Sequence, residues 1–266
     1  MSARIPILTV IPHGGLIVPE ELSGYEEVTP FNIFFESDSG ADALFSTNAD
    51  AGSVIKSGIS RLFVDMDREF RMLYPSTDDG VIKSKTSMNK TIFKDGCYPD
   101  EIAISNILKR YYFPFHEKMR ETLKEYEVIF IIECHTHTAV GPENSPDRGR
   151  PRPLVITEYT ADNNDVILKT ASPDMAMDLA SIMGRLFSAE GDTVAGDYRV
   201  SGNSSGYIMK NYGTKGIPML RLSLSRSLFM NDRYFDLEGL QIDNRRMSRL
   251  NEIYRTGLER FLNKYF

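Results

Sequence analysis

The residues with the clearest chemical potential in this chain lie in the segment Val128–Thr138, whose sequence is VIFIIECHTHT. Five apolar residues run directly into Glu133, His135 and His137, which occupy alternate positions. Alternate side chains of a strand point to the same face, so one carboxylate and two imidazoles are expected to share a face where a buried strand ends. The chain has only four histidines, and this segment holds two of them. That concentration indicates a metal site.

A second apolar segment, Ile5–Gly15, contains a third histidine, His13, beside a glycine-rich turn. A catalytic zinc usually has three protein ligands from His and Asp or Glu, and keeps one position open for water. We therefore predict that His13 and His135 bind a single zinc ion. The acidic segment FFESDSGAD supplies the carboxylate ligand; we favour Asp38 and keep Glu36 as the alternative.

Glu133 and His137 are expected to support catalysis from the same strand. Glu133 lies deeper in the strand, where a carboxylate can orient a neighbouring metal ligand. His137 lies further along, where an imidazole can support a ligand or contact the substrate. A lone histidine at this position would be explained as a hydrogen-bonded strand-end residue. The presence of Glu133 and His137 in the same strand, and of His13 at another strand end, favours the metal site instead.

Arginines form a second group of candidates, because Arg61, Arg68 and Arg226 flank predicted strands. The arginine fork binds a carboxylate through two parallel hydrogen bonds, so the set predicts a substrate that carries carboxylates. The segment RLFVDMDREF also contains Asp65 and Asp67, and pairing with these acids is the better explanation for any single arginine.

Alternating strands and helices are expected to position these residues. Strands are predicted at Ile5–Ile11, within Gly58–Asp67, and at Val128–Cys134, Leu154–Thr157 and Ile217–Leu224. Helices are predicted at Glu36–Asn48, Glu101–Lys124 (interrupted by Pro114), Pro173–Glu190 and Asp236–Tyr265. This order predicts one α/β domain over residues 1–266, with a central, mostly parallel mixed sheet and helices on both faces. Ligands collect beyond the carboxyl ends of such strands, where the sequence places His13, Asp65, Asp67, His135 and Arg226.

The composition excludes several other classes of protein. A net charge of −6 argues against a nucleic-acid binder, and no apolar run is long enough for a membrane span. The N-terminus lacks the pattern of a signal peptide. Cys97 and Cys134 are expected to be reduced thiols, which makes a cytoplasmic protein the default. Neither the G-x-S-x-G elbow of serine hydrolases nor a phosphate-binding glycine motif is present.

Seven segments, taken in chain order, resemble the N-formylglutamate amidohydrolase (N-formylglutamate deformylase) family. They are IPHGGLIVPEEL, ESDSGADALF, RLFVDMDREF, RYYFPFHEKM, IIECHTHT, SSGYIMKNYG and LRLSLSRSLFMND. The resemblance implies a phosphorylase/hydrolase-like fold similar to that of zinc carboxypeptidases, with a central mixed sheet and one zinc ion. It also implies hydrolysis of a small acidic N-acyl amino acid, typically N-formyl-L-glutamate to glutamate and formate.

The resemblance also assigns individual residues. His13 and His135 match the strand-end histidines of the family, and Asp38 matches its acid in the following helix. Arg226 matches the arginine before its L(Y/F)M run. A further match covers the family's Arg…Asp…Arg segment, here Arg61, Asp65 and Arg68.

One position departs from the family pattern. The late strand of the family reads roughly Q-I-E-I-N-R, and this chain has Ser223 at the glutamate, which by analogy with carboxypeptidases would be the general base. A serine hydroxyl with no base beside it cannot take a proton as a carboxylate can. Either another acid substitutes, with Glu133 as the nearest candidate by face, or the activity is weakened or altered. Arg221, in place of the family's glutamine, adds a cation beside Ser223 that is expected to shape the substrate pocket.

These observations support an enzyme first: a metal-dependent amidohydrolase with His13, Asp38 and His135 on zinc. Glu133, His137 and Arg226 would serve catalysis, and Arg61, Arg68, Arg221 and Ser223 would serve substrate binding. The alternative is a catalytically impaired family member that acts as a small-molecule binding or regulatory protein. A carboxypeptidase-like peptidase is a third possibility. Substrate, acyl group, general base, bound metal and oligomeric state are left open.

Overall fold

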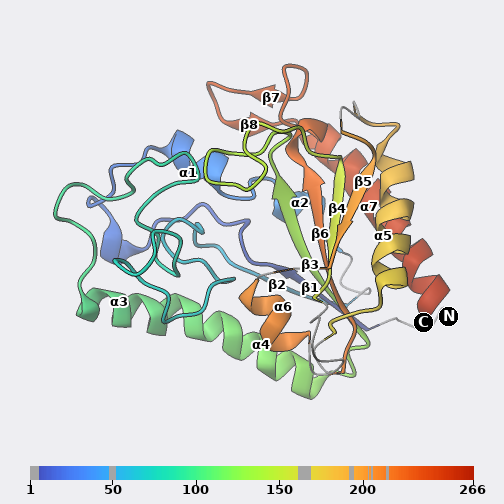
Figure 1. Cartoon of the computed structure of the whole chain (residues 1–266), viewed down its shortest axis with the longest axis horizontal. Coiled ribbons are helices and arrows are strands. Elements are labelled where there is room, and N and C mark those ends of the chain that lie inside the picture. The colour runs from blue at the N-terminus through green and yellow to red at the C-terminus, as the bar shows by residue number, and fades with distance from the viewer. Residues whose placement is uncertain are drawn as a thin grey trace.

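The computed structural model describes residues 6–47, 52–160, 169–191, 195–202, 204, 206–213 and 216–266. One six-stranded sheet lies at the centre, with helices beside it (Figure 1). Its strands, in spatial order, are β2 (Gly52–Lys56), β1 (Ile7–Ile11), β3 (Phe130–His137), β6 (Met219–Ser225), β4 (Val155–Glu158) and β5 (Tyr198–Ser201).

The sheet is mostly parallel. Strand β1 runs parallel to both β2 and β3, and β3 runs parallel to β6. Strand β4 pairs antiparallel with β6 and parallel with β5. The carboxyl ends of β1, β3 and β6 therefore meet at one edge of the sheet, which is where the predicted site residues follow their strands.

Helices cover both faces of the sheet, as predicted. One core contains side chains of α2 (Ala41–Leu44), α5 (Pro173–Phe187) and α7 (Asn244–Tyr265). The other contains side chains of α3 (Glu101–Ile107), the π-helical turn η2 (Leu108–Tyr112), α4 (Phe113–Glu125) and α6 (Tyr207–Tyr212). Because both faces are covered, every residue of β1 and β3 is buried.

Local sequence signals explain where the helices begin. Ser172 caps α5 by accepting a hydrogen bond from the amide of Met175, and Pro173 occupies the first turn. Asp243 caps α7 and Asp100 caps α3 in the same way. The helix α1 (Pro30–Glu36) begins with a capping box between Thr29 and Asn32.

Two predicted elements are wrong. No strand forms within Gly58–Asp67, whose backbone makes turns such as Phe63 N–H to Ser60 O, although Leu62, Phe63 and Val64 are fully buried. Beside β3, the other neighbour of β1 is the partly exposed strand β2, which the sequence did not indicate. The helix predicted at Glu36–Asn48 is also divided.

The divided helix has a physical cause. Helix α1 ends at Glu36 and α2 occupies Ala41–Leu44, and the turn between them includes Gly40 at a φ of 86°. This left-handed conformation favours glycine and interrupts a helix. Asn48, like Ile5 of the first predicted strand, lies outside the described residues.

The other predicted elements are confirmed with shifted ends. Strand β3 extends to His137, and α5 ends at Phe187. The helix over Glu101–Lys124 is not broken at Pro114, because the π-helical turn η2 leads into α4 and the proline falls in its first turn. The short strands β7 (Phe235–Asp236) and β8 (Gln241–Ile242) precede α7.

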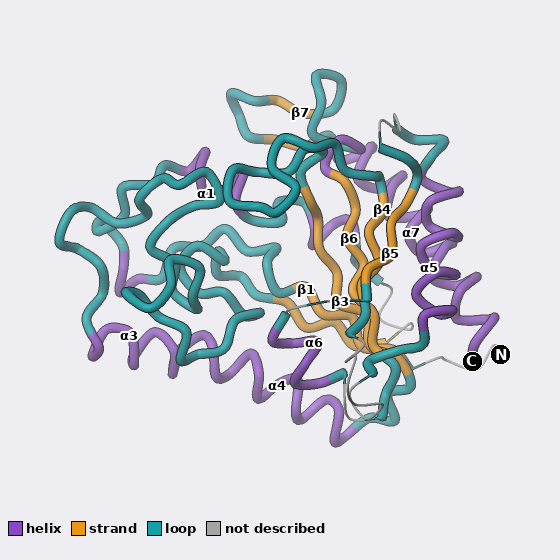
Figure 2. Tube along the Cα trace, in the orientation of Figure 1, coloured by secondary structure: helices purple, strands orange, loops and turns teal. Residues whose placement is uncertain are grey.

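A long irregular segment, residues 57–100, separates β2 from α3. It fills much of the side of the molecule away from α5 and α7, together with α1 and its flanking loops (Figure 2). The described part of the chain also forms the 3₁₀ turns η1 (Glu20–Leu22) and η4 (Arg226–Leu228). No helix in the described part of the chain is long and apolar enough to span a membrane.

Candidate metal centre and active site

His13, Asp38 and His135 meet at the carboxyl ends of β1 and β3, as the sequence predicts. One potential ligand atom from each of the three lies within 4.8 Å of those of the others, and all three side chains are buried. The backbone also ties the first two together, because the amide of Asp38 donates to the carbonyl of His13 at 2.8 Å. We refer to these three residues as the His–Asp–His cluster.

Close backbone packing holds the loop that carries His13. A Cβ on Gly15 would lie 2.2 Å from the carbonyl carbon of Gly58, so only glycine fits where these two segments cross. Ile17 continues the contact by donating from its amide to the carbonyl of Gly58 at 3.0 Å. The glycine-rich turn after His13 is thus required to bring the loop against the irregular segment.

Both histidines of the cluster present Nδ1 toward Asp38. Nε2 of His13 lies 2.6 Å from Oδ1 of Asp65, and Nε2 of His135 lies 2.7 Å from Oε1 of Glu133. Nδ1 of His135 lies 2.9 Å from Oδ2 of Asp38. Nδ1 of His13 lies 3.8 Å from the same oxygen and has no hydrogen-bond partner among the described residues.

This arrangement fits a metal cation. A carboxylate can only accept, so Nε2 of each ring carries a hydrogen, and Nδ1 of the neutral His13 ring has a lone pair. Nδ1 of His135 also faces a carboxylate, at 2.9 Å, and carries a hydrogen there, whose place a bound metal ion would take. An orphaned, buried Nδ1 on His13 that faces a carboxylate oxygen is costly as it stands, whereas a cation between the Nδ1 atoms and Asp38 would satisfy all three groups. The carboxylate behind each ring is the usual support for a metal-binding histidine.

Burial and neighbouring charges shift the pKa values of the cluster. Burial, reinforced by the Arg61 charge, lowers the pKa of His13 to about 4. Burial alone would lower the pKa of His135, but its hydrogen bonds to Asp38 and Glu133 raise it to about 9. Burial opposes ionisation of Asp38, yet its contacts with His135, His13 and Arg226 hold its pKa below the ordinary value.

Arg226 fixes the carboxylate of the cluster. It donates from Nη2 to Oδ1 of Asp38 at 3.1 Å and from Nε to Oγ1 of Thr136 at 2.9 Å. A third bond runs from Nη1 to the carbonyl of Phe35. Thr136 itself donates to Oδ1 of Asp38 at 3.2 Å. Asp38 thus keeps Oδ2, the oxygen that faces both histidines, for the cluster.

Arg221 lies in a buried ion-pair network and not in the substrate pocket, which corrects the role expected of it. Its Nη2 donates to Oδ2 of Asp67 at 2.6 Å and to Oε1 of Glu133 at 2.9 Å. Burial disfavours ionisation of Glu133, but Arg221 and His135 lower its pKa to about 2. Glu133 is therefore placed to hold His135, and its carboxylate is fully buried.

Arg61 and Arg68 face a cleft beside the cluster. Arg61 donates to Oδ2 of Asp65 at 3.2 Å, and Arg68 donates to Oδ2 of Asp79 at 2.6 Å. Lys83 bridges the two acids, with 3.0 Å between its Nζ and Oδ2 of Asp65. The expected pairing within the segment RLFVDMDREF is thus confirmed for Arg61, whereas Arg68 pairs with Asp79 outside it, and the side chain of Arg61 remains 25% exposed.

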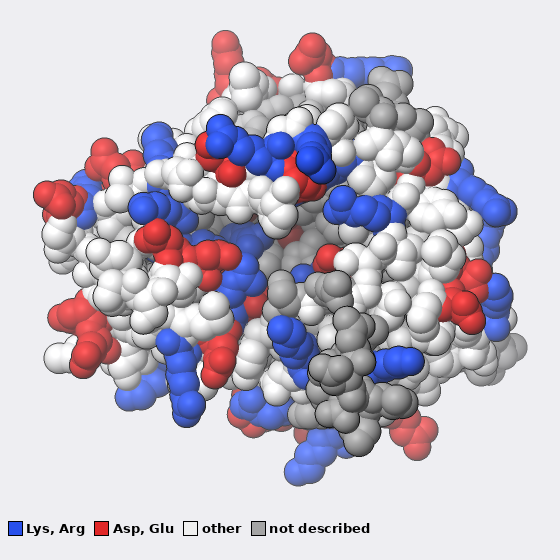
Figure 3. Space-filling model, in the orientation of Figure 1, with Lys and Arg blue, Asp and Glu red and all other residues white. Residues whose placement is uncertain are grey.

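The cleft is basic. Its volume is about 460 Å³, a size suited to a small molecule. Among the described residues, six cationic side chains line it: Arg61, Arg68, Lys83, Lys85, Arg152 and Arg226. Four described acids do so as well: Glu36, Asp38, Asp78 and Asp79. A space-filling view shows one face of the molecule hollowed near its centre, with basic and acidic side chains in the hollow (Figure 3).

His137 also lines the cleft and lies next to Ser223. Its Nδ1 lies 2.9 Å from Oγ of Ser223, and its Nε2 lies 2.9 Å from the carbonyl oxygen of Pro153. Burial lowers the pKa of His137 to about 4, so the ring is neutral near pH 7. The expectation that Ser223 has no base beside it is therefore wrong.

Comparison with known proteins identifies the family. The model of a family described as N-formylglutamate amidohydrolase matches residues 5–230. The chain belongs to this family. It is thus an amidohydrolase by descent, as the resemblance implied. A search of the curated proteins found no match.

Solved structures of similar fold agree with the family. An N-formylglutamate amidohydrolase from Ralstonia eutropha JMP134 matches with a TM-score of 0.68 and 16% identity, over 96% of this chain and 93% of that chain. A gene product from Agrobacterium tumefaciens matches with a TM-score of 0.62 and 14% identity, over 99% and 92%. At these identities the likeness shows the α/β fold.

The alternative ligand of this amidohydrolase lies away from the cluster. The carboxylate of Glu36 accepts hydrogen bonds from the amide and hydroxyl of Ser87 on the cleft wall. The fourth histidine, His116, is buried between Tyr212 and the carbonyl of Met66. Asp38 is thus the acid that the fold brings to both histidines.

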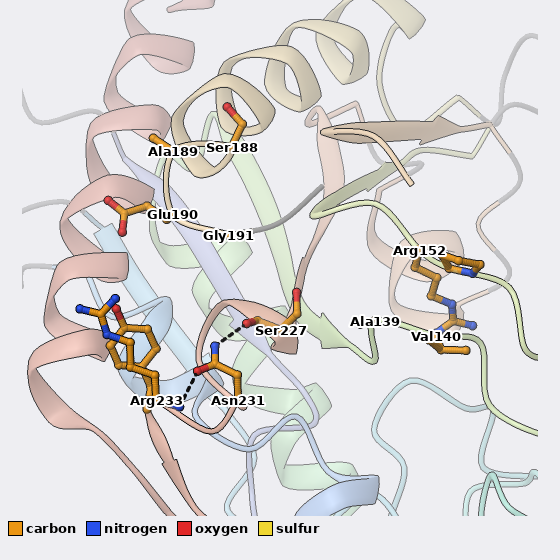
Figure 4. A pocket seen from close by; sticks show the side chains of 12 residues that line it. Ala139, Val140, Arg152, Ser188, Ala189, Glu190, Gly191, Ser227, Asn231 and Arg233 are labelled. Carbon is orange, nitrogen blue, oxygen red and sulfur yellow. Dashed lines mark hydrogen bonds between the residues drawn. The ribbon is translucent and has the colours of Figure 1, made fainter. Parts of the chain in front are cut away.

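A larger cavity of about 700 Å³ contains none of the cluster (Figure 4). Glu190, Ser227, Asn231 and Arg233 line it, and Arg152 forms part of the walls of both this cavity and the basic cleft. Its lining residues make ordinary structural hydrogen bonds, such as the one that Asn231 donates to the carbonyl of Ser227 at 2.9 Å. Size alone does not make this cavity the active site of the amidohydrolase.

Sequence reasoning did not find every partner of the cluster. Lys83, which pairs with Asp65, lies in none of the motifs and carries no sequence signal. Thr136 was not among the residues predicted for the site, yet its hydroxyl donates to Asp38. Asp65 was expected in the site, but its contact with His13 was not.

Proposed function

We propose that this protein is a zinc-dependent amidohydrolase that cleaves the amide of a small acidic N-acyl amino acid, such as N-formyl-L-glutamate, to glutamate and formate. The observation that supports it most strongly is the pair of Nδ1 atoms facing Asp38, with Asp65 and Glu133 behind the rings. His13, Asp38 and His135 would hold one zinc ion.

The bound zinc would supply a Lewis acid that lowers the pKa of water and polarises the acyl carbonyl. The protein supplies the arrangement around it. Asp65 and Glu133 keep the hydrogen on Nε2 of each histidine, and Arg226 keeps Asp38 in place. Arg226 also brings a positive charge to the edge of the cleft, where it can stabilise the oxyanion of the tetrahedral intermediate.

The basic cleft is the support for an acidic substrate. Arg61 and Arg68 line it and remain partly exposed, at 25% and 22% of their side chains. Each guanidinium has five N–H donors, so pairing with one aspartate leaves donors for a substrate carboxylate. Glutamate derivatives carry two carboxylates, and the two arginines would bind them.

A cytoplasmic location remains part of the proposal. Its support is that Cys97 and Cys134 are both free thiols, the state expected of cysteines in a reducing compartment.

The test is hydrolysis of N-formyl-L-glutamate by protein loaded with zinc, with N-acetyl-L-glutamate and N-formyl-L-glutamine as comparisons. We expect formate release, its loss after chelation and its return when zinc is added back. Equal activity on the glutamine derivative, which has one carboxylate instead of two, would contradict the proposed substrate class. Failure on all acidic N-acyl amino acids, by a protein that binds zinc, would favour the alternative of a binding protein.

Two variants separate the candidate ligands. Asp38→Asn is expected to lose both zinc and activity, because it removes the charge that faces both histidines. Glu36→Gln is the matched control, two residues away, and is expected to keep its zinc because Glu36 contacts Ser87 instead. Zinc content of the two proteins, measured by elemental analysis, decides between them. The reverse result would make Glu36 the ligand.

A further inference from the structure

Hydrolysis by this site requires a group that accepts a proton from the attacking water, and the buried carboxylates are poorly placed for it. Among the described residues, the cluster's own Asp38 and three carboxylates beside it each already accept hydrogen bonds or ion pairs from arginine or lysine; the three are Asp65, Asp67 and Glu133. All four are fully or almost fully buried. The proton acceptor must therefore be sought elsewhere on the same face.

Ser223 and His137 form a hydrogen-bonded pair with a defined direction. Nε2 of His137 lies 2.9 Å from the carbonyl oxygen of Pro153, and a carbonyl can only accept, so Nε2 carries the hydrogen. In the neutral ring Nδ1 then has the lone pair. Ser223 Oγ, 2.9 Å from Nδ1, must be the donor. The hydroxyl oxygen keeps its own lone pairs for another donor.

The sheet places this pair beside the cluster. Ser223 is the register partner of His135 in the parallel pairing of β3 with β6, so their side chains leave the same face of neighbouring strands. Neighbouring strands in a sheet lie about 5 Å apart, so Ser223 is adjacent to His135 across the strand pair. His137 is two residues beyond His135 on β3 and lines the basic cleft.

From this geometry we infer that Ser223 and His137 act as a proton relay for the hydrolysis, with Ser223 contacting the attacking water and His137 acting through it. The inference rests on the amidohydrolase function proposed above. Ser223 takes one proton from water while it passes its own to Nδ1 of His137, and the water oxygen bonds to the acyl carbon. When the carbon–nitrogen bond breaks, the amine nitrogen takes the proton back along the same path, and His137 is again neutral.

The direction of the relay can be tested without any activity. In metal-free protein labelled with ¹⁵N-histidine, nuclear magnetic resonance reports which ring nitrogen of His137 carries hydrogen. His137→Gln identifies the signal by its loss. We expect the Nε2–H form, with an Nδ1 resonance that moves in Ser223→Ala. The Nδ1–H form, or an Nδ1 resonance that ignores Ser223→Ala, would overturn the inference.

Kinetics with zinc-loaded protein test the coupling. A general base typically contributes about 100-fold or more to the rate, so Ser223→Ala and His137→Gln should each lower kcat by that order with little change in KM. Gln is chosen because its amide can keep the donor to Pro153. Because the two residues form one path, the double variant should lose no more than either single variant.

Matched controls exclude a merely structural effect. Thr157→Val removes a buried hydroxyl from β4, beside Leu222 and on the opposite face, and should leave kcat unchanged. Zinc content must be equal in all the proteins compared. Full kcat in either single variant, or a double variant whose loss is the product of the two, would overturn the relay. A wild-type protein without hydrolysis would instead overturn the proposed function, and the resonance experiment would still decide the hydrogen-bond direction.

Discussion

The central residues of this protein are held by charge as much as by shape. Each histidine of the cluster has a carboxylate on Nε2, Asp65 for His13 and Glu133 for His135, and these carboxylates are held by cations in turn. Such support fixes the ring orientation and the tautomer, which determines whether Nδ1 has a lone pair for a metal.

Removing one supporting carboxylate should weaken metal binding. Glu133→Gln is expected to lower zinc affinity about 10- to 100-fold, because the neutral amide no longer holds the Nε2–H form of His135 as strongly. Competition with a zinc chelator measures this affinity. Glu158→Gln is the control, because Glu158 pairs with the same Arg221, at 3.6 Å, but does not contact the histidine. Equal affinity in wild-type and Glu133→Gln proteins would contradict the supporting role.

At this scale the sequence predicted which residues meet, but only part of what each one touches. His13, Asp38 and His135 could be chosen because their types suit zinc and each follows an apolar run or helix. Arg221 was assigned to substrate binding because strand alternation shows which face a side chain lies on but not which residue it contacts. In the structure its guanidinium is already paired with the buried carboxylate of Asp67.

At the scale of elements, the joint between α4, α6 and the irregular segment is expected to be sensitive to pH. His116 on α4 lies 3.0 Å from both the hydroxyl of Tyr212 on α6 and the carbonyl of Met66. The side chain is 2% exposed, and burial lowers its pKa from 6.5 to about 4. The joint therefore requires a neutral imidazole.

The stability of this joint is expected to fall in mild acid. Between pH 6.5 and 4, His116 binds a proton in the unfolded chain but stays neutral in the folded protein. The contribution of the neutral His116 to folding stability is therefore complete above pH 6.5 and is lost as the pH falls toward 4. The loss is about 3 kcal/mol at most. Urea unfolding of wild-type and His116→Gln proteins across this range measures it. The variant should show the shallower loss, and parallel curves would contradict the assignment.

The elements that the sequence predicted are those with simple patterns. The wholly buried strands β1 and β3, the mostly buried strand β6 and the capped, amphipathic helix α5 were predicted because their hydrophobic period and their caps agree. The strand predicted over residues 61–67 does not form, because an apolar run need not be a strand. Its apolar side chains are buried by packing within an irregular segment, and this tertiary packing leaves no local pattern in the sequence.

At the scale of the whole molecule, the site joins parts of the chain that are far apart in sequence. His13 follows β1, and Glu133 and His135 lie in β3. Asp38 comes from the turn between α1 and α2, and Asp65 from the irregular segment. Sequence patterns placed several of these residues at one edge of the sheet but could not show which side chain contacts which, because the contacts depend on the order of strands in the sheet. A metal ion bound there would hold these segments together and stabilise the folded state.

The most direct test of this account is the zinc content of the purified protein, measured beside that of His135→Ala. The account predicts close to one zinc per chain in the wild type and its loss in the variant, because His135 supplies one of the two Nδ1 atoms that face Asp38. Wild-type protein that is free of metal, and stays so after zinc is supplied, would contradict it.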